Sequence, residues 1–200
     1  IGLICDEWGT WHPPVKGTNP SWLRQQNTIR DALVAALTLD IFNNHSDKLV
    51  MANIAQTVNV LQAMILTDGQ RVLVTPTFHV YKMYAPHQNA IAIHMDIDTP
   101  EISVMLVPMV SGSCSLKDGV ITLTLVNSHA TDHAPICLEF PKNDLDINIL
   151  SWQSLHSDDI HDHNTFEEPE KVKIKDMKVD VETISLPPAS VNVFQIKIPK

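Results

Sequence analysis

The sequence predicts a mixed fold in which two β/α units of an incomplete TIM-type (β/α)8 barrel are followed by an antiparallel β-sandwich. Up to about residue 88, apolar residues recur with a helical period or in short buried runs, and afterwards they alternate with polar residues. The chain has 200 residues, of which 44% are hydrophobic, but a closed barrel usually needs ~250 residues. We therefore expect residues 1–87 to form part of a barrel and residues 88–200 to form the sandwich. The remaining barrel strands would come from a missing N-terminal part or from another polypeptide.

The first strand is predicted at the start of the chain, where a short apolar run ends in Asp6 and Glu7 and two tryptophans follow. Buried parallel strands read as apolar runs, and barrel active sites lie at the carboxyl ends of the strands. We therefore expect Glu7 at the rim of a cleft, with Trp8 and Trp11 as flat apolar walls for a sugar ring. Side chains of neighbouring strand residues point to opposite faces, so we interpret Asp6 as structural. For Trp8 we favour packing over sugar contact, because tryptophan is strongly buried on average.

The rest of the first half is expected to alternate helices and strands. Asn19 and Pro20 are a cap and a first-turn residue, and they predict a long helix that ends near His45. A second buried strand is predicted over residues 49–55, and it brings Gln56 to its carboxyl end. The segments after it are predicted to be a helix over residues 57–64, a turn at Asp68 and Gly69, an extended piece over residues 71–75, and a helix over residues 76–87 stopped by Pro86.

The second half reads as short strands joined by turns, which is typical of a β-sandwich. Asp118 and Gly119 stand where a hairpin turn is needed, and Pro187 and Pro188 separate the last two strands because proline cannot lie inside a ladder. The predicted strands cover residues 90–97, 102–107, 120–126, 136–140, 147–152, 172–184 and 191–198.

Composition excludes several classes of function. The formal net charge is −9 and the 14 Lys and Arg residues are scattered, so no basic nucleic-acid surface is expected. No apolar run approaches the ~18 residues of a membrane span, and no signal peptide is visible. The cysteines Cys5, Cys114 and Cys137 have no CxxC spacing, which predicts reduced, buried thiols. The compartment stays open, with the cytoplasm favoured over the periplasm or a secreted location.

Two other groups of polar residues receive structural interpretations. The run His156–His163 mixes imidazoles and carboxylates, but its spacing matches no zinc or calcium loop, so we favour a solvated loop over a metal site. Asn59 and Gln62 are expected to satisfy backbone groups or to cap a helix. No metal and no cofactor are therefore expected.

Three separated segments, in this order, resemble the α-L-arabinofuranosidases of glycoside hydrolase family fifty-one: GLICDEWGTW at residues 2–11, MANIAQTVN at residues 51–59 and HNTFEEP at residues 163–169. The likeness runs along essentially the whole chain. In that family a (β/α) barrel is followed by a jelly-roll β-sandwich, and the Asp-Glu-Trp motif ends the seventh barrel strand. The resemblance therefore implies the same division that the periodicity predicts, with residues 1–87 as the last two β/α units of the barrel and residues 88–200 as the jelly-roll sandwich. We interpret the third segment as a packing element of the sandwich.

Roles carried over by position follow from the resemblance. It implies that Glu7 is the catalytic nucleophile, that Trp11 walls the sugar-binding subsite, and that Gln56 hydrogen-bonds the bound arabinose. The family often has Asn where this chain has Gly9 and Tyr where it has His12, so we expect the loop after the nucleophile to shape the aglycone side differently. The Asn-Glu pair that carries the family's acid/base lies upstream of these residues, and no substitute for it is visible.

The leading hypothesis is the C-terminal part of a retaining α-L-arabinofuranosidase that releases terminal arabinofuranose from arabinan, arabinoxylan or their oligosaccharides. Such enzymes need two carboxyls ~5 Å apart, so this part alone is expected to be inactive. Two alternatives concern residues 88–200: a carbohydrate-binding module, which the single tryptophan Trp152 disfavours, or a structural and oligomerisation module. The resemblance also implies a homo-oligomer.

Overall fold

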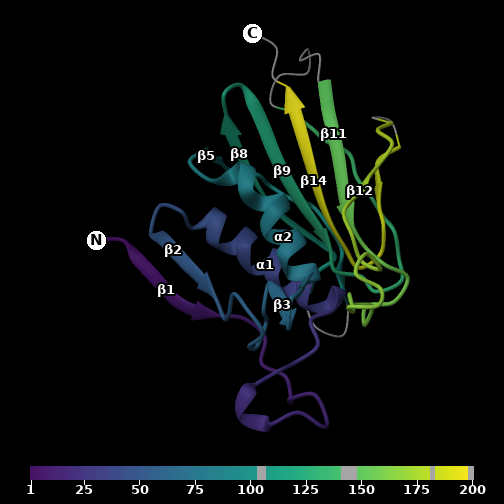
Figure 1. Cartoon of the computed structure of the whole chain (residues 1–200). Helices are drawn as coiled ribbons and strands as arrows, with labels where there is room; N and C mark the ends of the chain where they lie inside the picture. The colour runs from purple at the N-terminus through teal and green to yellow at the C-terminus, as the bar shows by residue number, and fades with distance from the viewer. Residues whose placement is uncertain (103–106, 141–147, 181–182, 198–200) are drawn as a thin grey trace.

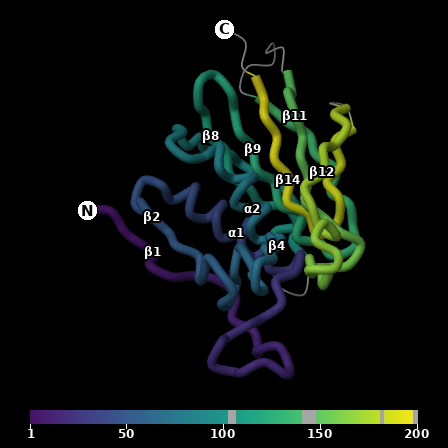
Figure 2. Tube along the Cα trace, viewed as in Figure 1, coloured from purple at the N-terminus to yellow at the C-terminus, as the bar shows by residue number. Residues whose placement is uncertain are grey.

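The computed structural model describes residues 1–102, 107–140, 148–180 and 183–197. In this part of the chain, the helices α1 (Ile29–Asn44) and α2 (Pro76–Tyr84) cover one face of a six-stranded antiparallel sheet (Figure 1). A small pair of parallel strands lies on the other side of the helices. Figure 2 shows that the chain begins at this strand pair and passes through the helices before it builds the sheet. The result is a layered arrangement in which the helices are shared by both sheets.

The parallel pair consists of β1 (Leu3–Trp8) and β2 (Leu49–Ile54), with α1 as the crossover between them. Parallel neighbours need such a crossover, because a tight turn can join only antiparallel strands. Both predicted strands of the first half are therefore confirmed. Their carboxyl ends lie at the same edge of the pair (Figure 1).

The helix predicted from Asn19 is in fact two separate elements. Asn19 caps a short 3-10 turn, η1 (Pro20–Trp22), and Leu23 ends this turn in a left-handed conformation with φ 50°. The long helix α1 starts later, behind its own capping box of Thr28 and Asp31. The prediction of one continuous helix is wrong because two cap signals follow one another and the second one begins the long helix.

The segment after β2 is a loop and a hairpin, so the helix predicted over residues 57–64 is wrong. Asn59 has φ 62° and its side chain bonds to the backbone N–H and the hydroxyl of Thr67, at 2.7 and 2.8 Å. This local bonding competes with a helix. The hairpin strands β3 (Ile65–Asp68) and β4 (Arg71–Val74) are antiparallel, which confirms the predicted turn and the extended piece. The last predicted helix is confirmed as α2 and the 3-10 turn η2 (Ala85–His87).

The large sheet has the strand order β12-β11-β14-β9-β8-β5, and all its neighbouring strands are antiparallel. Its strands are β5 (Ile91–Ile93), β8 (Val110–Lys117), β9 (Val120–Asn127), β11 (Asn148–Leu155), β12 (Lys175–Asp176) and β14 (Ser190–Lys197). Two short pairs lie outside it, β6 (Glu101–Ile102) with β7 (Val107–Pro108) and β10 (Ala134–Pro135) with β13 (Ser185–Leu186). This mostly β architecture is consistent with the predicted β-sandwich.

The predicted strands of the second half differ in outcome. Those over residues 120–126, 147–152 and 191–198 are confirmed as β9, β11 and β14, although residues 147 and 198 lie outside the described residues. Of the strand predicted over residues 90–97, only the short strand β5 is present. Of residues 102–107, the structure describes only the two ends, which belong to β6 and β7.

Two apolar runs were wrongly predicted as continuous strands. In the described residues, 136–140 holds no strand and 172–184 holds only β12. The apolar side chains of 136–140 instead pack on the sheet face that is turned away from the helices, around Leu123, Trp152 and Phe194, as do Met177, Val179 and Ile184. Val172 and Ile174, at the start of the second run, pack in the cluster on the helix side. An apolar run that covers a sheet has the same pattern as a strand within one, so periodicity alone does not separate them.

The strand β8 was missed because its residues are small: V-S-G-S-C-S begins it. Their size matters at the contact with α1, where the Asn44 side chain donates to the carbonyl of Gly112 at 3.0 Å. A Cβ on Gly112 would lie 2.1 Å from the carbonyl oxygen of Thr124 on β9. The small side chains therefore permit both strand pairing and the close approach of the helix.

We expect Gly112→Val to lower the free energy of unfolding by about 3 kcal/mol, because β8 must move away from β9 to make room. Denaturant unfolding measures the loss. Lys117→Val at the exposed end of the same strand is the control and should change stability by less than about 1 kcal/mol. Equal stability of the two variants would contradict the close contact at Gly112.

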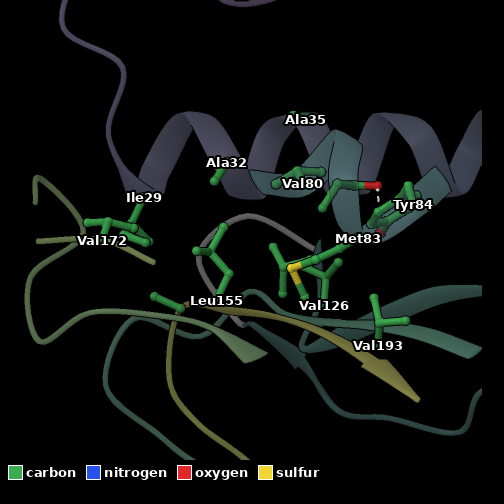
Figure 3. Packing of buried hydrophobic residues seen from close by; sticks show 13 residues of the cluster. Ile29, Ala32, Ala35, Val80, Met83, Tyr84, Val126, Leu155, Val172 and Val193 are labelled. Carbon is green, nitrogen blue, oxygen red and sulfur yellow. Dashed lines mark hydrogen bonds between the residues drawn. The ribbon is translucent and has the colours of Figure 1, made fainter. Parts of the chain in front are cut away.

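One apolar cluster joins the helices to the sheet (Figure 3). Residues of α1 and α2, such as Ala32, Ala35 and Met83, pack against Val126 and Val193 of the sheet. The cluster thus crosses the predicted boundary between residues 87 and 88. That boundary remains a prediction, and the two sides of it share a core.

A buried carboxyl group lies in the same interface. Asp40 of α1 is 2% exposed, and its Oδ1 accepts hydrogen bonds from the hydroxyls of Ser113 and Thr124, both at 2.6 Å. Within the described residues, Oδ2 has no hydrogen-bond partner. Burial raises the pKa of Asp40 to about 7, against the lowering effect of the hydrogen bonds with Ser113, Thr124 and Tyr84. The contact between helix and sheet therefore contains a group that titrates near neutrality.

This group makes stability depend on pH. The folded pKa of about 7 exceeds the unfolded value near 3.8, so its contribution is complete below the unfolded pKa and is lost as the pH rises through 7. We expect the unfolding free energy, taken relative to Asp40→Asn, to fall by about 2–3 kcal/mol between about pH 5 and pH 8. Denaturant titrations of both proteins across this range measure it. A constant difference would contradict the raised pKa.

Candidate active site

The predicted site residues lie at one edge of the parallel pair. Glu7 is the penultimate residue of β1. Gln56 is the second residue after the end of β2, directly behind Ala55. The backbone N–H of Ala55 donates to the carbonyl of Trp8 at 2.8 Å, which joins the two strand ends directly. The side chains of Glu7 and Gln56 are exposed, and Trp11 in the loop after β1 is 69% exposed. The fold thus brings these residues to the same edge, and among the described residues no hydrogen bond links their side chains.

The strand that carries Glu7 is irregular at this point. Cys5 pairs with Ala52 and Trp8 pairs with Ile54, so three steps along β1 match two along β2. The bulge falls between Cys5 and Trp8 and therefore includes Asp6 and Glu7. Bulges redirect side chains and are frequent next to active sites. The prediction that Asp6 and Glu7 point to opposite faces assumed strict alternation along the strand, and the bulge interrupts that alternation.

The two neighbours of Glu7 have different environments. Trp8 packs edge-on against Phe42, with ring centroids 5.4 Å apart, and stacks near Tyr81 at 6.4 Å. The packing interpretation of Trp8 is therefore confirmed. Asp6 is exposed and makes no side-chain hydrogen bond or ion pair with the described residues. A structural contact for Asp6 is thus not found in this part of the chain.

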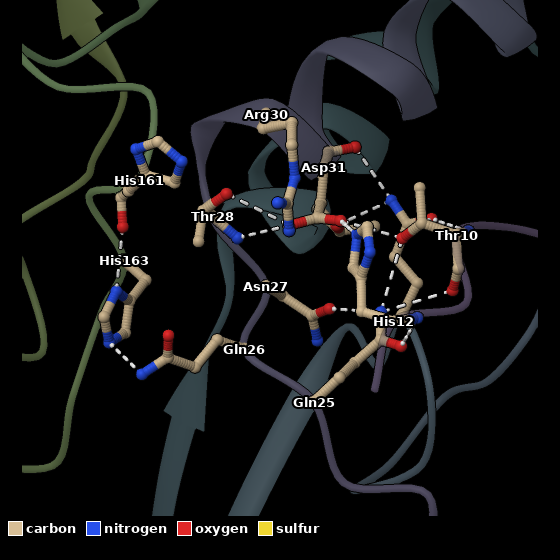
Figure 4. A network of polar contacts seen from close by, with 12 residues as sticks. Thr10, His12, Gln25, Gln26, Asn27, Thr28, Arg30, Asp31, His161 and His163 are labelled. Atoms are coloured by element: carbon tan, nitrogen blue, oxygen red, sulfur yellow. Dashed lines mark hydrogen bonds and ion pairs between the residues drawn. The ribbon is translucent and has the colours of Figure 1, made fainter. Parts of the chain in front are cut away.

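The loop after β1 is held by a network of polar contacts around Asp31 (Figure 4). Asp31 is fully buried on α1, and its Oδ1 accepts from the hydroxyl of Thr10 at 2.8 Å and contacts His12 Nε2 at 2.9 Å. Its Oδ2 accepts from the backbone N–H of Thr28 at 2.8 Å and lies 3.3 Å from Arg30. One carboxylate therefore fixes both the start of α1 and the loop that carries Trp11.

The charge of Asp31 is stabilised by these partners. Burial raises the pKa of Asp31. Together, the hydrogen bonds from Thr28, Thr10 and His12 and the charge of Arg30 lower it by more, so the pKa lies below its usual value. The carboxylate is ionised at neutral pH and can accept every one of these hydrogen bonds. Asp31 was not predicted as a functional residue, although the pattern Thr28-x-x-Asp31 before an apolar run is a capping signal.

Gln62 supports the same loop from the segment after β2. Its side chain is fully buried, accepts from the backbone N–H of Thr10 at 2.8 Å, and donates to the carbonyl of Asp31 at 2.8 Å and to Thr77 at 3.2 Å. The expectation that Gln62 satisfies backbone groups is confirmed. Gly9 lies beside it with φ 145°, and a Cβ there would be 3.2 Å from Gln62 Oε1. A side chain at position 9 would be strained by its backbone and would crowd this amide.

The loop with alternating His and Asp residues has a structural task. The carbonyls of Ile160 and Asp162 accept hydrogen bonds from the first backbone N–H groups of α1, those of Arg30 and Ile29, at 3.0 and 3.1 Å. Asp162 also pairs with Lys171 at 2.6 Å. No group of three or more His, Cys, Asp or Glu residues in the described part could hold a metal ion.

The segment HNTFEEP packs as predicted. Asn164 is 5% exposed, and its side chain exchanges hydrogen bonds with the backbone of Val172 and donates to the carbonyl of Val74 on β4, at 3.1 Å. Phe166 lies under the guanidinium of Arg71, 4.5 Å from ring centre to carbon. The packing interpretation of this segment is confirmed, and the segment joins the sandwich to the hairpin after β2.

The cysteines are all free, and Cys137 is exposed while Cys5 and Cys114 are half-buried. The prediction that all three thiols are buried is wrong, because Cys137 follows β10 in a covering segment, and their reduced state stays a prediction. In the described residues, no helix has both the length and the apolar character that a membrane span requires.

Comparisons with known proteins agree with this architecture. The family model for the "Alpha-L-arabinofuranosidase C-terminal domain" matches residues 6–190. The intracellular exo-alpha-L-arabinofuranosidase of Bacteroides ovatus is 41% identical, over 98% of this chain and 40% of that protein.

Solved structures are similar too. The family 51 arabinofuranosidase from Xanthomonas axonopodis pv. citri has a TM-score of 0.91 and 40% identity, over 98% of this chain and 41% of that one. The Thermotoga maritima alpha-L-arabinofuranosidase in an arabinose complex has a TM-score of 0.81, over 96% of this chain and 42% of that one. At 21% identity, the latter likeness concerns the fold alone. The chain spans about two fifths of the length of these relatives.

Proposed function

Because the chain belongs to the C-terminal domain family of the α-L-arabinofuranosidases of glycoside hydrolase family 51, we propose that the protein carrying it is a retaining glycosidase. It releases terminal α-L-arabinofuranosyl residues from arabinan- or arabinoxylan-type glycans. One observation carries the proposal: Glu7 and Gln56 are exposed at the adjoining carboxyl ends of two parallel strands. Active sites of (β/α)8 barrels lie at this end of the strands.

The exposed apolar surface of the parallel pair supports the completion of a barrel. Leu3, Ile4, Val50 and Met51 are 59%, 55%, 66% and 52% exposed. Parallel strands normally have both faces covered, so these side chains are suited to contact further strands and helices. We propose that residues 1–87 supply the last two β/α units of a TIM-type barrel. The other units, with the acid/base carboxyl, then come from residues outside this chain.

The proposed chemistry assigns one role to each residue. The carboxylate of Glu7 attacks the anomeric carbon of the arabinofuranose and forms a covalent ester, while the acid/base protonates the departing oxygen. Water activated by the same acid/base then releases arabinose. The amide of Gln56 hydrogen-bonds the sugar, and the indole of Trp11 stacks on its ring. Two carboxyl groups suffice for this reaction, so no cofactor is part of the proposal.

Covalent trapping tests this function. A 2-fluoro arabinofuranosyl donor with a good leaving group should inactivate the complete enzyme and leave an ester on the peptide that contains Glu7, which mass spectrometry locates. The Asp6→Asn variant should be labelled at the same place, because only Glu7 forms the ester. Label on another carboxylate would remove Glu7 as the nucleophile, and steady hydrolysis without any trapped ester would remove the retaining mechanism.

The two sugar-binding roles have smaller expected effects. We expect Gln56→Ala and Trp11→Ala each to lower kcat/KM on an aryl α-L-arabinofuranoside by roughly tenfold to a hundredfold, through a lost hydrogen bond and lost stacking. Trp22→Ala is the matched control, since Trp22 is a similarly exposed tryptophan (63%) on the same loop. A loss with Trp22→Ala as large as that with Trp11→Ala would contradict the specific role of Trp11.

For the sandwich we propose a scaffold role. Its one tryptophan, Trp152, is 6% exposed, stacks on Phe194 and donates its indole N–H to Asn192. It is therefore not an open platform for a sugar. The sheet instead supports α1 and α2, which in turn lie behind the strands that carry Glu7 and Gln56. Assembly into a homo-oligomer is part of the proposal, and the mass of the native particle would test it.

A further inference from the structure

A cavity of about 240 Å³ lies between three segments on the side of the molecule where β1 and β2 end. Its walls come from the loop between β1 and α1, the β3–β4 hairpin and residues 163–167. All three segments lie on this side of the fold. The loop and the hairpin follow the ends of β1 and β2, and residues 163–167 follow Ile160 and Asp162, whose carbonyls bond to the start of α1. None of the roles proposed above uses this cavity.

The lining combines an apolar floor with polar side chains. Val15, Leu66, Leu73 and Phe166 form the apolar part. Among the polar residues, Gln26 and His163 contact each other at 3.3 Å between their Nε2 atoms. Arg24 is exposed, and its guanidinium makes no hydrogen bond or ion pair with the described residues. The lining therefore combines an apolar surface with a donor group that has no partner among the described residues.

This combination suits a neutral sugar ring, whose C–H face packs on apolar side chains while its hydroxyls hydrogen-bond polar ones. At about 30 Å³ per water molecule, the cavity has room for about eight waters, which is the scale of one sugar unit. An anionic unit fits less well, because the protein has a net charge of −9 and Glu167 is part of the lining.

The cavity adjoins the candidate active site through one side chain. Gln25 is 3% exposed and belongs to the lining. Its Oε1 accepts from the backbone N–H of His12 at 2.9 Å, and its Nε2 donates to the carbonyl of Thr10 at 3.2 Å. Trp11 lies between these two residues. A side chain of the cavity wall thus holds the backbone on both sides of the proposed sugar-stacking tryptophan.

We infer that this cavity is an accessory subsite that binds one neutral sugar unit of the polysaccharide, apart from the unit that is cleaved. The inference rests on the proposed function and identifies a contact beyond the reacting sugar. Arg24 donates to the hydroxyls of the bound unit, and Leu66 contributes to the floor beneath it. A substrate with several sugar units gains from this subsite, and an aryl arabinofuranoside does not reach it.

Two substitutions test the inference in the complete enzyme. Arg24→Ala removes the donor, and Leu66→Trp fills the cavity. Each should lower kcat/KM on arabinopentaose or on an arabinosylated xylo-oligosaccharide by about tenfold, with an unchanged value on 4-nitrophenyl α-L-arabinofuranoside. Lys16→Ala is the matched control, since it removes an exposed cation of the same loop that does not line the cavity. Thermal unfolding of each variant verifies the fold.

Direct binding separates this inference from the proposed function. Isothermal titration of arabinopentaose into Glu7→Gln should give a dissociation constant that rises about tenfold when Arg24→Ala is added. If the wild-type enzyme hydrolyses arabinofuranosides but both cavity variants act on and bind the oligosaccharides like wild type, the subsite is overturned and the proposed function stands. If the wild-type enzyme has no arabinofuranosidase activity, the proposed function fails, and an unchanged titration with Arg24→Ala would overturn the subsite independently.

Discussion

Replacing Glu7 with alanine in the complete enzyme is expected to lower kcat on an aryl α-L-arabinofuranoside by about 10⁴- to 10⁶-fold, as for other nucleophiles whose covalent step is lost. The reason is the position of the carboxylate at the exposed carboxyl end of β1, beside the end of β2. Alanine leaves the strand intact and removes only the group that would attack the anomeric carbon. Steady-state rates with a chromogenic substrate measure the loss.

A chemical rescue distinguishes a nucleophile from a residue that only supports the site. Azide can enter the space left by Glu7→Ala and attack the same carbon, so it should restore turnover and give an arabinofuranosyl azide of inverted configuration. Asp6→Asn is the control, because Asp6 is adjacent, exposed and acidic, and we expect it to keep wild-type activity within about tenfold. Wild-type rates in Glu7→Ala, or a loss with Asp6→Asn as large as that with Glu7→Ala, would contradict the assignment of Glu7 as the nucleophile.

The second large effect is expected at Asp31. We expect Asp31→Ala to lower the free energy of unfolding by about 3–5 kcal/mol, because it leaves buried donors without their acceptor. These donors are the hydroxyl of Thr10 and the backbone N–H of Thr28, with His12 as a further partner. The loop with Trp11 loses its anchor at the same time, so KM for arabinofuranosides should rise in the folded fraction. Denaturant unfolding and substrate saturation curves measure the two effects.

The dependence on pH gives an independent test at the same residue. The folded pKa of Asp31 lies below its unfolded value near 3.8, so its stabilisation is present above that unfolded pKa and is lost as the pH falls through the folded pKa. The stability difference between wild type and Asp31→Ala should therefore shrink in acid. Asp47→Ala serves as the control, since Asp47 is exposed just beyond α1 and should change stability by less than about 0.5 kcal/mol. A difference that grows as the pH falls would contradict the lowered pKa.

Much of the first half could be predicted because its signals are local. The apolar runs before Glu7 and Gln56, with helical periodicity between them, predicted two parallel strands joined by a helix, and β1, α1 and β2 have this order. The helix predicted over residues 57–64 failed because Asn59 bonds to Thr67, eight residues on. Such a contact exists only after the hairpin has formed, so the apolar period of this segment does not reveal it.

The candidate site was predictable to a similar extent. That Glu7 stands at a strand end was a prediction from its apolar run, and β1 confirms it, while its catalytic role and those of Trp11 and Gln56 stay predictions. The residues that hold the loop were less visible. Asp31 was readable as a cap, but its bonds to Thr10 and His12 span about twenty residues of chain and depend on how that chain returns.

The sequence by itself determined the order of β1, α1 and β2 and the edge at which Glu7 and Gln56 lie, because these depend on residues close together in the chain. Only the tertiary structure decided which apolar runs are paired strands and which merely cover the sheet, since both bury the same kind of side chain. Only the structure showed that the small residues of β8 allow α1 to pack closely and that Asp40 is buried against the sheet. It also showed that residues on both sides of the predicted boundary at 87 and 88 form one hydrophobic core. Those features arise where segments far apart in the sequence come into contact. The free energy of each contact depends on both segments, so neither segment predicts it alone.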